Sequence, residues 1–230
     1  MFEKQKNSAG QSTELKPILE SEKTGDAGMS QGSPSRFIIS EDSVRLAARL
    51  QASAAAGQLI AFIGTHKKDE VATIATEVAL AMVHAGVRPV LLIDGNVHTP
   101  SIHKTFNVAV APGLAQFLEG RVNLEEIIQC SGEVDLWVLP AGNPSTNPVS
   151  LFSSVLFSAL LTEIKKQFRC VIVNSPPILD HAESVIIASR SDGVVMVLAA
   201  GARTRTDLRK IKDELDGVKA RLIGAVLSKS

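Results

Sequence analysis

Short runs of apolar residues recur along this chain, and segments with helical periodicity separate them. An unbroken apolar run is typical of a strand that is buried on both faces, because successive side chains of a strand point to opposite sides. Each run therefore predicts an internal strand of a sheet. The predicted strands are Leu59–Ile63, Pro89–Ile93, Leu136–Leu139, Val171–Val173, Val194–Leu198 and Leu222–Leu227.

The segments between these strands carry apolar residues at steps of three and four, which predicts helices that bury one face. Ser40, followed by two acidic residues, is typical of a helix N-cap, and Pro148 suits a first helical position. The predicted helices are 40–54, 71–82, 147–168, 182–189 and one that begins near Thr204. Strands that alternate with helices indicate an α/β fold: a mostly parallel sheet with helices on both faces, in three α/β/α layers.

Composition divides the chain into a tail and one domain. Residues 1–36 are rich in polar residues and have almost no apolar clusters, so we expect this N-terminal segment to be disordered. Residues 37–230 contain all the predicted elements and form the expected domain. The 45% share of hydrophobic residues in the whole chain fits a globular α/β protein.

Charge and cysteine content limit the partners and the compartment. The 24 basic and 24 acidic residues cancel, which argues against nucleic acid as a partner. No apolar run reaches the roughly 18 residues of a membrane span, and the polar N-terminus does not have the pattern of a signal peptide. Only two cysteines occur, too few for a disulfide framework, so we expect a cytoplasmic protein.

The candidate site lies in three loops that follow predicted strands: Gly64–Glu70, Asp94–Pro100 and Asn174–Asp180. In open α/β sheets, ligands bind beyond the carboxyl ends of the strands. The first loop joins a strand to a helix N-terminus, the usual frame for binding a phosphate group. The candidate phosphate-loop residues are Gly64, Thr65, His66, Lys67, Lys68, Asp69, Glu70, Val71, Ala72 and Thr73.

This loop has the frame of a phosphate-binding loop but lacks its chemistry. Such loops carry Gly-Lys-Ser/Thr for backbone approach, phosphate charge and Mg²⁺ ligation. Here the corresponding place reads Glu70-Val71-Ala72-Thr73. Losing a charge-assisted hydrogen bond costs roughly 1.5–3 kcal/mol, and a carboxylate about 4 Å from a phosphate adds roughly 1–4 kcal/mol of repulsion. Together these changes weaken phosphate binding by about two to five decades.

Three further segments, in this order, resemble the bacterial tyrosine autokinases of capsule and exopolysaccharide export, P-loop proteins related to the MinD/ParA-type ATPases. Val90–Phe106 is similar to the family's second phosphate-site motif, an apolar run followed by Asp-x-Asp-x-Arg. Leu139–Phe152 is similar to its Pro-Ala-Gly…Asn-Pro segment, and Val171–Lys210 to its third motif, an apolar run followed by Asp-x-Pro-Pro. The resemblance covers about residues 40–228 and implies the P-loop fold.

The departures from the family pattern fall on residues that hold nucleotide and metal. In the first motif, the resemblance places Val71 where the family has its phosphate-binding lysine and Ala72 where it has the Mg²⁺-binding hydroxyl. In the second motif, Asp94 matches the first acid, the one residual catalytic candidate. The remaining departures are Asn96 for the second acid, His98 for the arginine and Asn174 for the metal-side acid of the third motif.

The resemblance implies a place in exopolysaccharide or capsule biosynthesis and export, and the coordinated losses predict a non-catalytic, regulatory relative of the kinases. The expected partner is a membrane-bound co-polymerase or chain-length regulator, or a related active kinase, which would recruit the chain to the inner membrane. Asp42, Arg45 and Ala48 match the family's Glu-x-x-Arg-x-x-Arg oligomerisation helix in part, which leaves a homo-oligomer open. We expect no cofactor, and no metal site, since the histidines lack a ligand spacing of the His-x-x-x-His kind.

The alternative is an active ATP- and Mg-dependent protein-tyrosine kinase or ATPase. Lys67 or Lys68 would then bind phosphate from a displaced position, with Asp94 as base or metal ligand. The chain contains no tyrosine, so the acceptor would have to belong to another protein.

Overall fold

The computed structural model describes residues 37, 39–53, 56–66, 70–144, 146–199 and 205–228. The predicted disordered tail, residues 1–36, lies outside the described residues, as do Lys67, Lys68 and Asp69 of the candidate phosphate loop.

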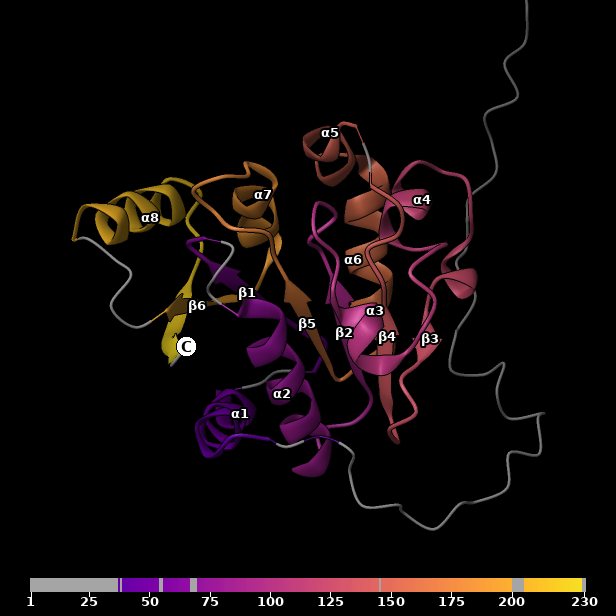
Figure 1. The fold of residues 1–230 in the computed structure, drawn as a ribbon, viewed down its shortest axis with the longest axis horizontal. Coiled ribbons are helices and arrows are strands. Elements are labelled where there is room, and N and C mark those ends of the chain that lie inside the picture. Colours follow the sequence, from indigo (N-terminus) through magenta and orange to yellow (C-terminus); the bar gives the residue numbers. More distant parts are fainter. Residues whose placement is uncertain are drawn as a thin grey trace, which may run out of the picture.

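The described residues form one seven-stranded sheet in the order β3-β4-β2-β5-β1-β6-β7 (Figure 1). All neighbouring strands are parallel except β3, which runs antiparallel to β4. The strands are β1 Gln58–Gly64, β2 Val90–Asp94, β3 Gln129–Cys130, β4 Leu136–Leu139, β5 Cys170–Asn174, β6 Gly193–Ala199 and β7 Leu222–Ser228. The predicted α/β fold class is confirmed, and each predicted strand is present within one or two residues.

Helices cover both faces of the sheet. The α-helices are α1 Glu41–Ser53, α2 Val71–His84, α3 Ile102–Phe106, α4 Leu114–Leu118, α5 Pro148–Phe152, α6 Val155–Gln167, α7 Glu183–Arg190 and α8 Arg205–Gly217, and a 3₁₀ turn spans Leu124–Glu126. One apolar cluster lies between the sheet and α1 to α3, and the other between the sheet and α4 to α8. This arrangement confirms the predicted three layers.

Strand β1 shows why an unbroken apolar run predicts a central strand. Leu59, Ala61 and Ile63 belong to the cluster under α4 to α8. Ile60 and Phe62 belong to the cluster under α1 and α2. Since alternate residues of a strand face opposite sides, both sides of β1 have to be apolar to be buried.

The predicted helix 147–168 is wrong as one element, because the structure divides it into α5 and α6. Ser154 has extended backbone, with ψ of 160°, and its hydroxyl accepts a hydrogen bond from the backbone N–H of Phe157 at 3.2 Å. This is the geometry of a helix N-cap, which starts a new helix. The short helices α3 and α4 and the two-residue strand β3 were not predicted, because elements of this length carry too few residues for a periodic pattern.

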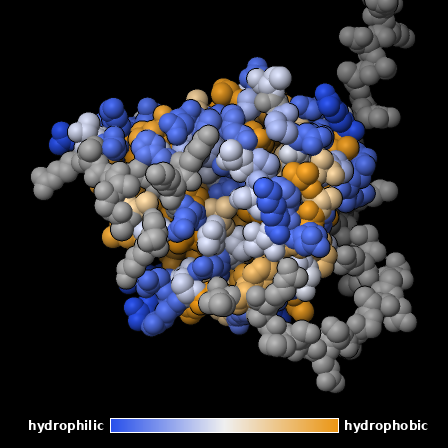
Figure 2. Space-filling model, viewed as in Figure 1, coloured by the Kyte–Doolittle hydropathy of each residue, from blue (hydrophilic) through white to orange (hydrophobic). Residues whose placement is uncertain are grey.

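On the face shown in Figure 2, hydrophilic and hydrophobic residues are interspersed over the surface.

Among the described helices, none combines the length and the apolar character that crossing a bilayer requires.

The cap at Ser154 gives a stability prediction. Ser154→Ala removes the hydroxyl that caps α6 and is expected to lower the free energy of unfolding by about 1 kcal/mol. Ser153→Ala, one residue earlier at the exposed end of α5, serves as the matched control and is expected to change it by less than about 0.5 kcal/mol. Urea unfolding measures both, and equal losses in the two variants would contradict the assignment of the cap.

Candidate phosphate-binding site

The three predicted loops meet at the carboxyl ends of β1, β2 and β5. In the sheet register Asn174 lies opposite both Asp94 of β2 and Phe62 of β1. Above these ends is a cavity of about 270 Å³, close to the lower limit of about 300 Å³ for small-molecule sites. It is lined by His66, Glu70, Val71, Ala72, Thr73, Asn96, Thr99, Ser101, Asn174, Ser175 and Pro177. The predicted convergence of the loops is confirmed, while their role in binding stays a prediction.

Glu70 stands immediately before α2 in a left-handed backbone conformation, with φ of 50° and ψ of 30°. This conformation favours glycine, the residue that a phosphate-binding loop has at this step. The Glu70 side chain does not cap α2. Its carboxylate instead accepts a hydrogen bond from the Ser228 hydroxyl at the end of β7. The start of α2 thus carries a carboxylate, which is tied to a strand at the sheet edge.

The next two residues belong to the hydrophobic core. Val71 is buried in the apolar cluster beneath α2, and Ala72 packs against the same cluster. Gly64 and Thr65 are also buried, and the Gly64 carbonyl accepts a hydrogen bond from the backbone N–H of Ile178 at 3.0 Å. The first loop is therefore joined to the third by its backbone.

Asp94 is fully buried, and four protein N–H groups donate to its carboxyl group. Oδ1 accepts from the Asn96 backbone at 3.2 Å and from Asn174 Nδ2 at 2.9 Å. Oδ2 accepts from the backbone N–H groups of Ser101 at 2.9 Å and Ile102 at 3.1 Å. Burial raises the pKa of Asp94, and the four hydrogen bonds oppose this effect. Both oxygens are thus used to anchor the second loop and the start of α3.

The two asparagines that replace acids have different surroundings. Asn96 folds its own loop: its Nδ2 donates to the Thr99 hydroxyl at 3.0 Å, and its Oδ1 accepts from the Thr99 backbone at 3.1 Å. Asn174 is buried at the floor of the cavity, where its amide binds Asp94. An aspartate in place of Asn174 would put two carboxylates in contact unless a cation lay between them.

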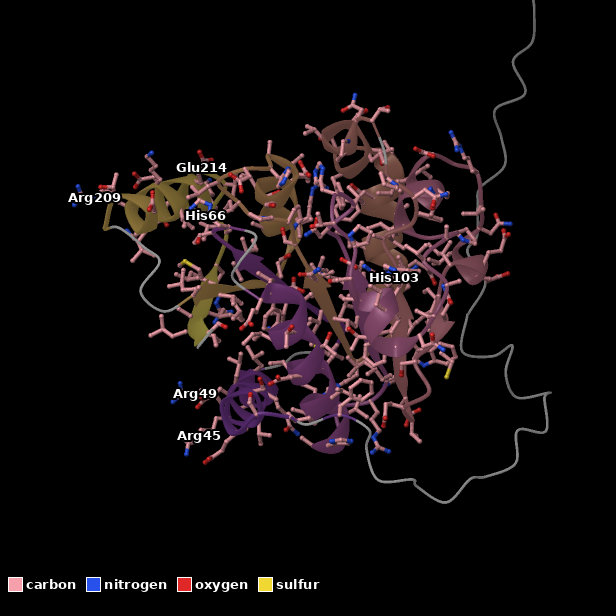
Figure 3. All side chains as sticks on the ribbon, viewed as in Figure 1. Arg45, Arg49, His66, His103, Arg209 and Glu214 are labelled. Atoms are coloured by element: carbon pink, nitrogen blue, oxygen red, sulfur yellow. The ribbon has the colours of Figure 1, made fainter. Side chains whose placement is uncertain are left out.

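The ionisable side chains among the described lining residues are His66 and Glu70; no lysine or arginine is among them. His66 Nδ1 lies 3.8 Å from Asp180 Oδ2, with both side chains partly exposed. In Figure 3 His66 lies beyond the end of β1, whereas His103 belongs to α3. Lys67 and Lys68, the lysines of the predicted loop, are not among the described residues, so the structure gives them no position.

Sequence reasoning named the pocket loops but not every residue in them. Thr99, Ser175 and Pro177 lie inside the predicted loops, and Ser101 follows directly. Ser228, which binds Glu70, could not be found from local pattern, because it lies 158 residues away in the chain.

Comparison with solved structures places the fold in a known class. The crystal structure of the chimerical protein CapA2B2 has a TM-score of 0.77 and 26% identity, and the match covers 84% of this chain and 85% of that one. The cell division ATPase MinD of Pyrococcus furiosus has a TM-score of 0.63 and covers 74% of this chain and 71% of its own. At 20% identity, MinD shows the fold alone. The chain therefore has the α/β fold of the MinD-like P-loop proteins.

Sequence comparison finds homologues among the bacterial tyrosine kinases. No protein-family model matches the chain. The tyrosine-protein kinase CpsD of Streptococcus agalactiae is 29% identical over 181 residues, which cover 78% of this chain and 79% of CpsD. The tyrosine-protein kinase YwqD of Bacillus subtilis is 32% identical over 156 residues, covering 68% of this chain and 65% of YwqD. The chain is a homologue of the bacterial tyrosine kinases, and the resemblance carried by its motifs is confirmed.

The Asp94 network gives a prediction about pKa and stability. Asn174→Ala removes one donor to the carboxylate, so the pKa of Asp94 is expected to rise further above its ordinary value of 3.8. At neutral pH the free energy of unfolding is expected to fall by about 1.5–3 kcal/mol. Carbon-13 NMR titration of the Asp94 carboxyl group and urea unfolding measure the two effects. Asn96→Ala is the control, because its side chain binds Thr99 and not Asp94.

The raised pKa of Asp94 determines how its contribution to the free energy of unfolding changes with pH. The unfolded chain loses the Asp94 proton near the ordinary value, whereas the folded chain keeps it to a higher pH. The contribution of this proton to stability is therefore present below that value and is lost as the pH rises through the folded pKa. An Asp94 signal that titrates at the ordinary value, or is unmoved by Asn174→Ala, would contradict the network.

Proposed function

We propose that this chain is a non-catalytic relative of the bacterial tyrosine kinases that acts as a binding or regulatory module in exopolysaccharide or capsule biosynthesis. The observation that supports this proposal most strongly is the chemistry of the cavity. A nucleotide site has to offset the charge of the phosphates, yet the described lining contains Glu70 and neither lysine nor arginine.

The metal side of the site supports the same proposal. Mg²⁺ is held through carboxylates and substrate phosphates. Asn96 and Asn174 offer neutral amides, and Asp94 already accepts four hydrogen bonds from the protein. A magnesium ion would have to displace some of these hydrogen-bond donors from Asp94. Displacing the backbone N–H groups of Ser101 and Ile102 would detach the start of α3 from the carboxyl group.

The proposed partner is a membrane-bound co-polymerase or chain-length regulator, or an active kinase of the same system. Helix α1 offers one surface for assembly of several copies. Asp42 and Arg45 are exposed along it, and Arg45 pairs with Glu41 within the helix. Figure 3 shows Arg45 and Arg49 extending outward from α1.

A second candidate function is an active tyrosine kinase, which is favoured by the names of the homologues, tyrosine-protein kinases. In this candidate Lys67 or Lys68 supplies the phosphate-binding charge. Its tyrosine acceptor lies on another protein, because these 230 residues contain no tyrosine.

Restoring the phosphate-loop residues tests the first proposal. In thermal unfolding, the wild-type chain is expected to shift by less than about 1 °C in millimolar Mg-ATP. The triple variant Glu70→Gly, Val71→Lys, Ala72→Thr is expected to shift by about 5–11 °C when the nucleotide reaches about a hundred times its dissociation constant. The matched control replaces Val71 with methionine, which keeps the other two changes without the charge. A wild-type shift as large as that of the triple variant would contradict the proposal.

Phosphoryl transfer separates the two candidates. With labelled ATP, Mg²⁺ and a glutamate–tyrosine copolymer as acceptor, the wild-type chain is expected to transfer no label. Transfer that is lost in the double variant Lys67→Ala, Lys68→Ala, or in Asp94→Ala, would instead establish the kinase.

A further inference from the structure

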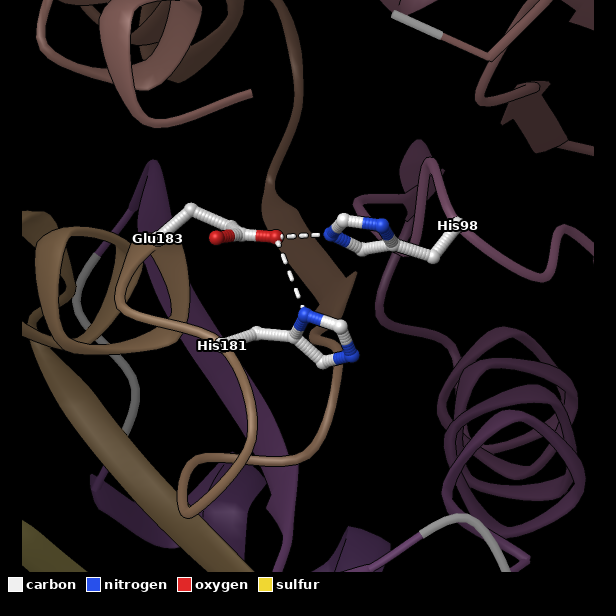
Figure 4. Close-up of side chains that lie close together, drawn as sticks. All are labelled: His98, His181 and Glu183. Carbon is white, nitrogen blue, oxygen red and sulfur yellow. Dashed lines mark hydrogen bonds and ion pairs between the residues drawn. The ribbon is translucent and has the colours of Figure 1, made fainter. Parts of the chain in front are cut away.

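Two histidines and a glutamate that are far apart in the chain meet at one point beside the cavity. His98 lies in the loop after β2, His181 lies in the loop before α7, and Glu183 is the first residue of α7. Figure 4 shows both imidazole rings turned toward the Glu183 carboxylate. One ligand atom from each residue lies within 4.8 Å of the other two. We propose that these three side chains bind a divalent transition metal ion of the Zn²⁺ type.

The distances among the three side chains can be compared with those of a metal centre. Nε2 of His98 contacts Oε1 of Glu183, and Nδ1 of His181 lies 3.8 Å from the same oxygen. The two rings stack with centroids 3.9 Å apart and planes inclined by 22°. Tetrahedral zinc with bonds of about 2.0–2.2 Å separates its ligand atoms by roughly 3.3–3.5 Å. The three ligand atoms are near enough to reach one ion, provided that the imidazole rings turn out of their stacked arrangement and the Glu183 carboxylate moves away from His98.

The three side chains form a donor set that suits a transition metal ion. The Glu183 side chain is only 3% exposed, and a buried glutamate requires a partner for its charge. A divalent ion uses both rings in their neutral form, and two histidines with one glutamate are a known ligand set of zinc.

Two features set this centre apart from a nucleotide-bound magnesium site. Mg²⁺ prefers oxygen ligands, whereas imidazole selects transition metals. His98 is about a third exposed, at 32%, which leaves access for water or an anion at the fourth position. Because His98 directly precedes Thr99 of the cavity lining, the ion would place positive charge at the rim of that cavity. The proposal does not require that the chain binds nucleotide.

Calorimetric titration of the full, tag-free chain with Zn²⁺ after chelator treatment tests the proposal. We expect one site with a dissociation constant in the micromolar range or below, and no binding of Mg²⁺ at the same concentrations. At about a hundred times the dissociation constant, Zn²⁺ is expected to raise the unfolding temperature by about 5–11 °C. Co²⁺ is expected to give d–d absorption of a nitrogen and oxygen site without the thiolate band that a cysteine ligand adds.

Substitutions of the proposed ligands test whether Zn²⁺ binds at this place. His98→Ala and His181→Ala are each expected to weaken Zn²⁺ binding at least tenfold, because losing even an indirect partner of a metal ligand costs about 10–100-fold. His84→Ala, at the exposed end of α2, and Cys130→Ser, the exposed thiol, are the controls and should leave binding unchanged. Glu183→Gln keeps the volume of the buried side chain and is expected to weaken Zn²⁺ binding. If that variant fails to fold, the variant of the more exposed residue, His98→Ala, still tests the site.

Three results would overturn the proposal. One is the absence of saturable Zn²⁺ binding up to about 100 µM. Another is binding that survives both His98→Ala and His181→Ala. The third is binding that disappears only with Cys130→Ser.

Discussion

The four hydrogen bonds to the buried carboxyl group of Asp94 hold the loops around the cavity in place. The carboxyl group binds the backbone of its own loop, the first N–H groups of α3 and the amide of Asn174 on the neighbouring strand. An isolated carboxylate could not be buried at this depth, because its desolvation would cost several kcal/mol. The four donors make burial possible, and in return Asp94 holds two of the three loops in register.

The same network limits what the site can do. In a site that holds Mg²⁺, an acid at this position would have to keep an oxygen for the ion, whereas both Asp94 oxygens are already occupied. Glu70 adds a carboxylate at the start of α2, where the helix dipole would otherwise favour an anion. The described lining of the cavity therefore combines the strand, loop and helix N-terminus of a phosphate-binding frame with a glutamate and no lysine or arginine. The tyrosine kinase homologues establish the fold, and the proposal of a non-catalytic role rests on the side chains of this cavity.

Much of the fold could be predicted from sequence because its central strands are buried on both faces. The short apolar runs of β1 and β5 are typical of strands buried on both faces, and their alternation with helical segments predicts a parallel sheet. The break at Ser154 could not be seen, because apolar periodicity continues across it and only the backbone geometry reveals the cap. Long-range contacts were also hidden: the pattern gives no sign that Ser228 meets Glu70 or that His98 meets Glu183, since each pair joins distant segments through the tertiary fold.

If the proposed function is right, the cavity at the ends of β1, β2 and β5 does not have enough positive charge to hold a magnesium nucleotide. Isothermal titration of the full chain with Mg-ATP at physiological ionic strength tests it most directly. We expect no saturable heat until the nucleotide reaches roughly millimolar concentration, in line with a loss of about two to five decades in affinity. A dissociation constant in the micromolar range would contradict it.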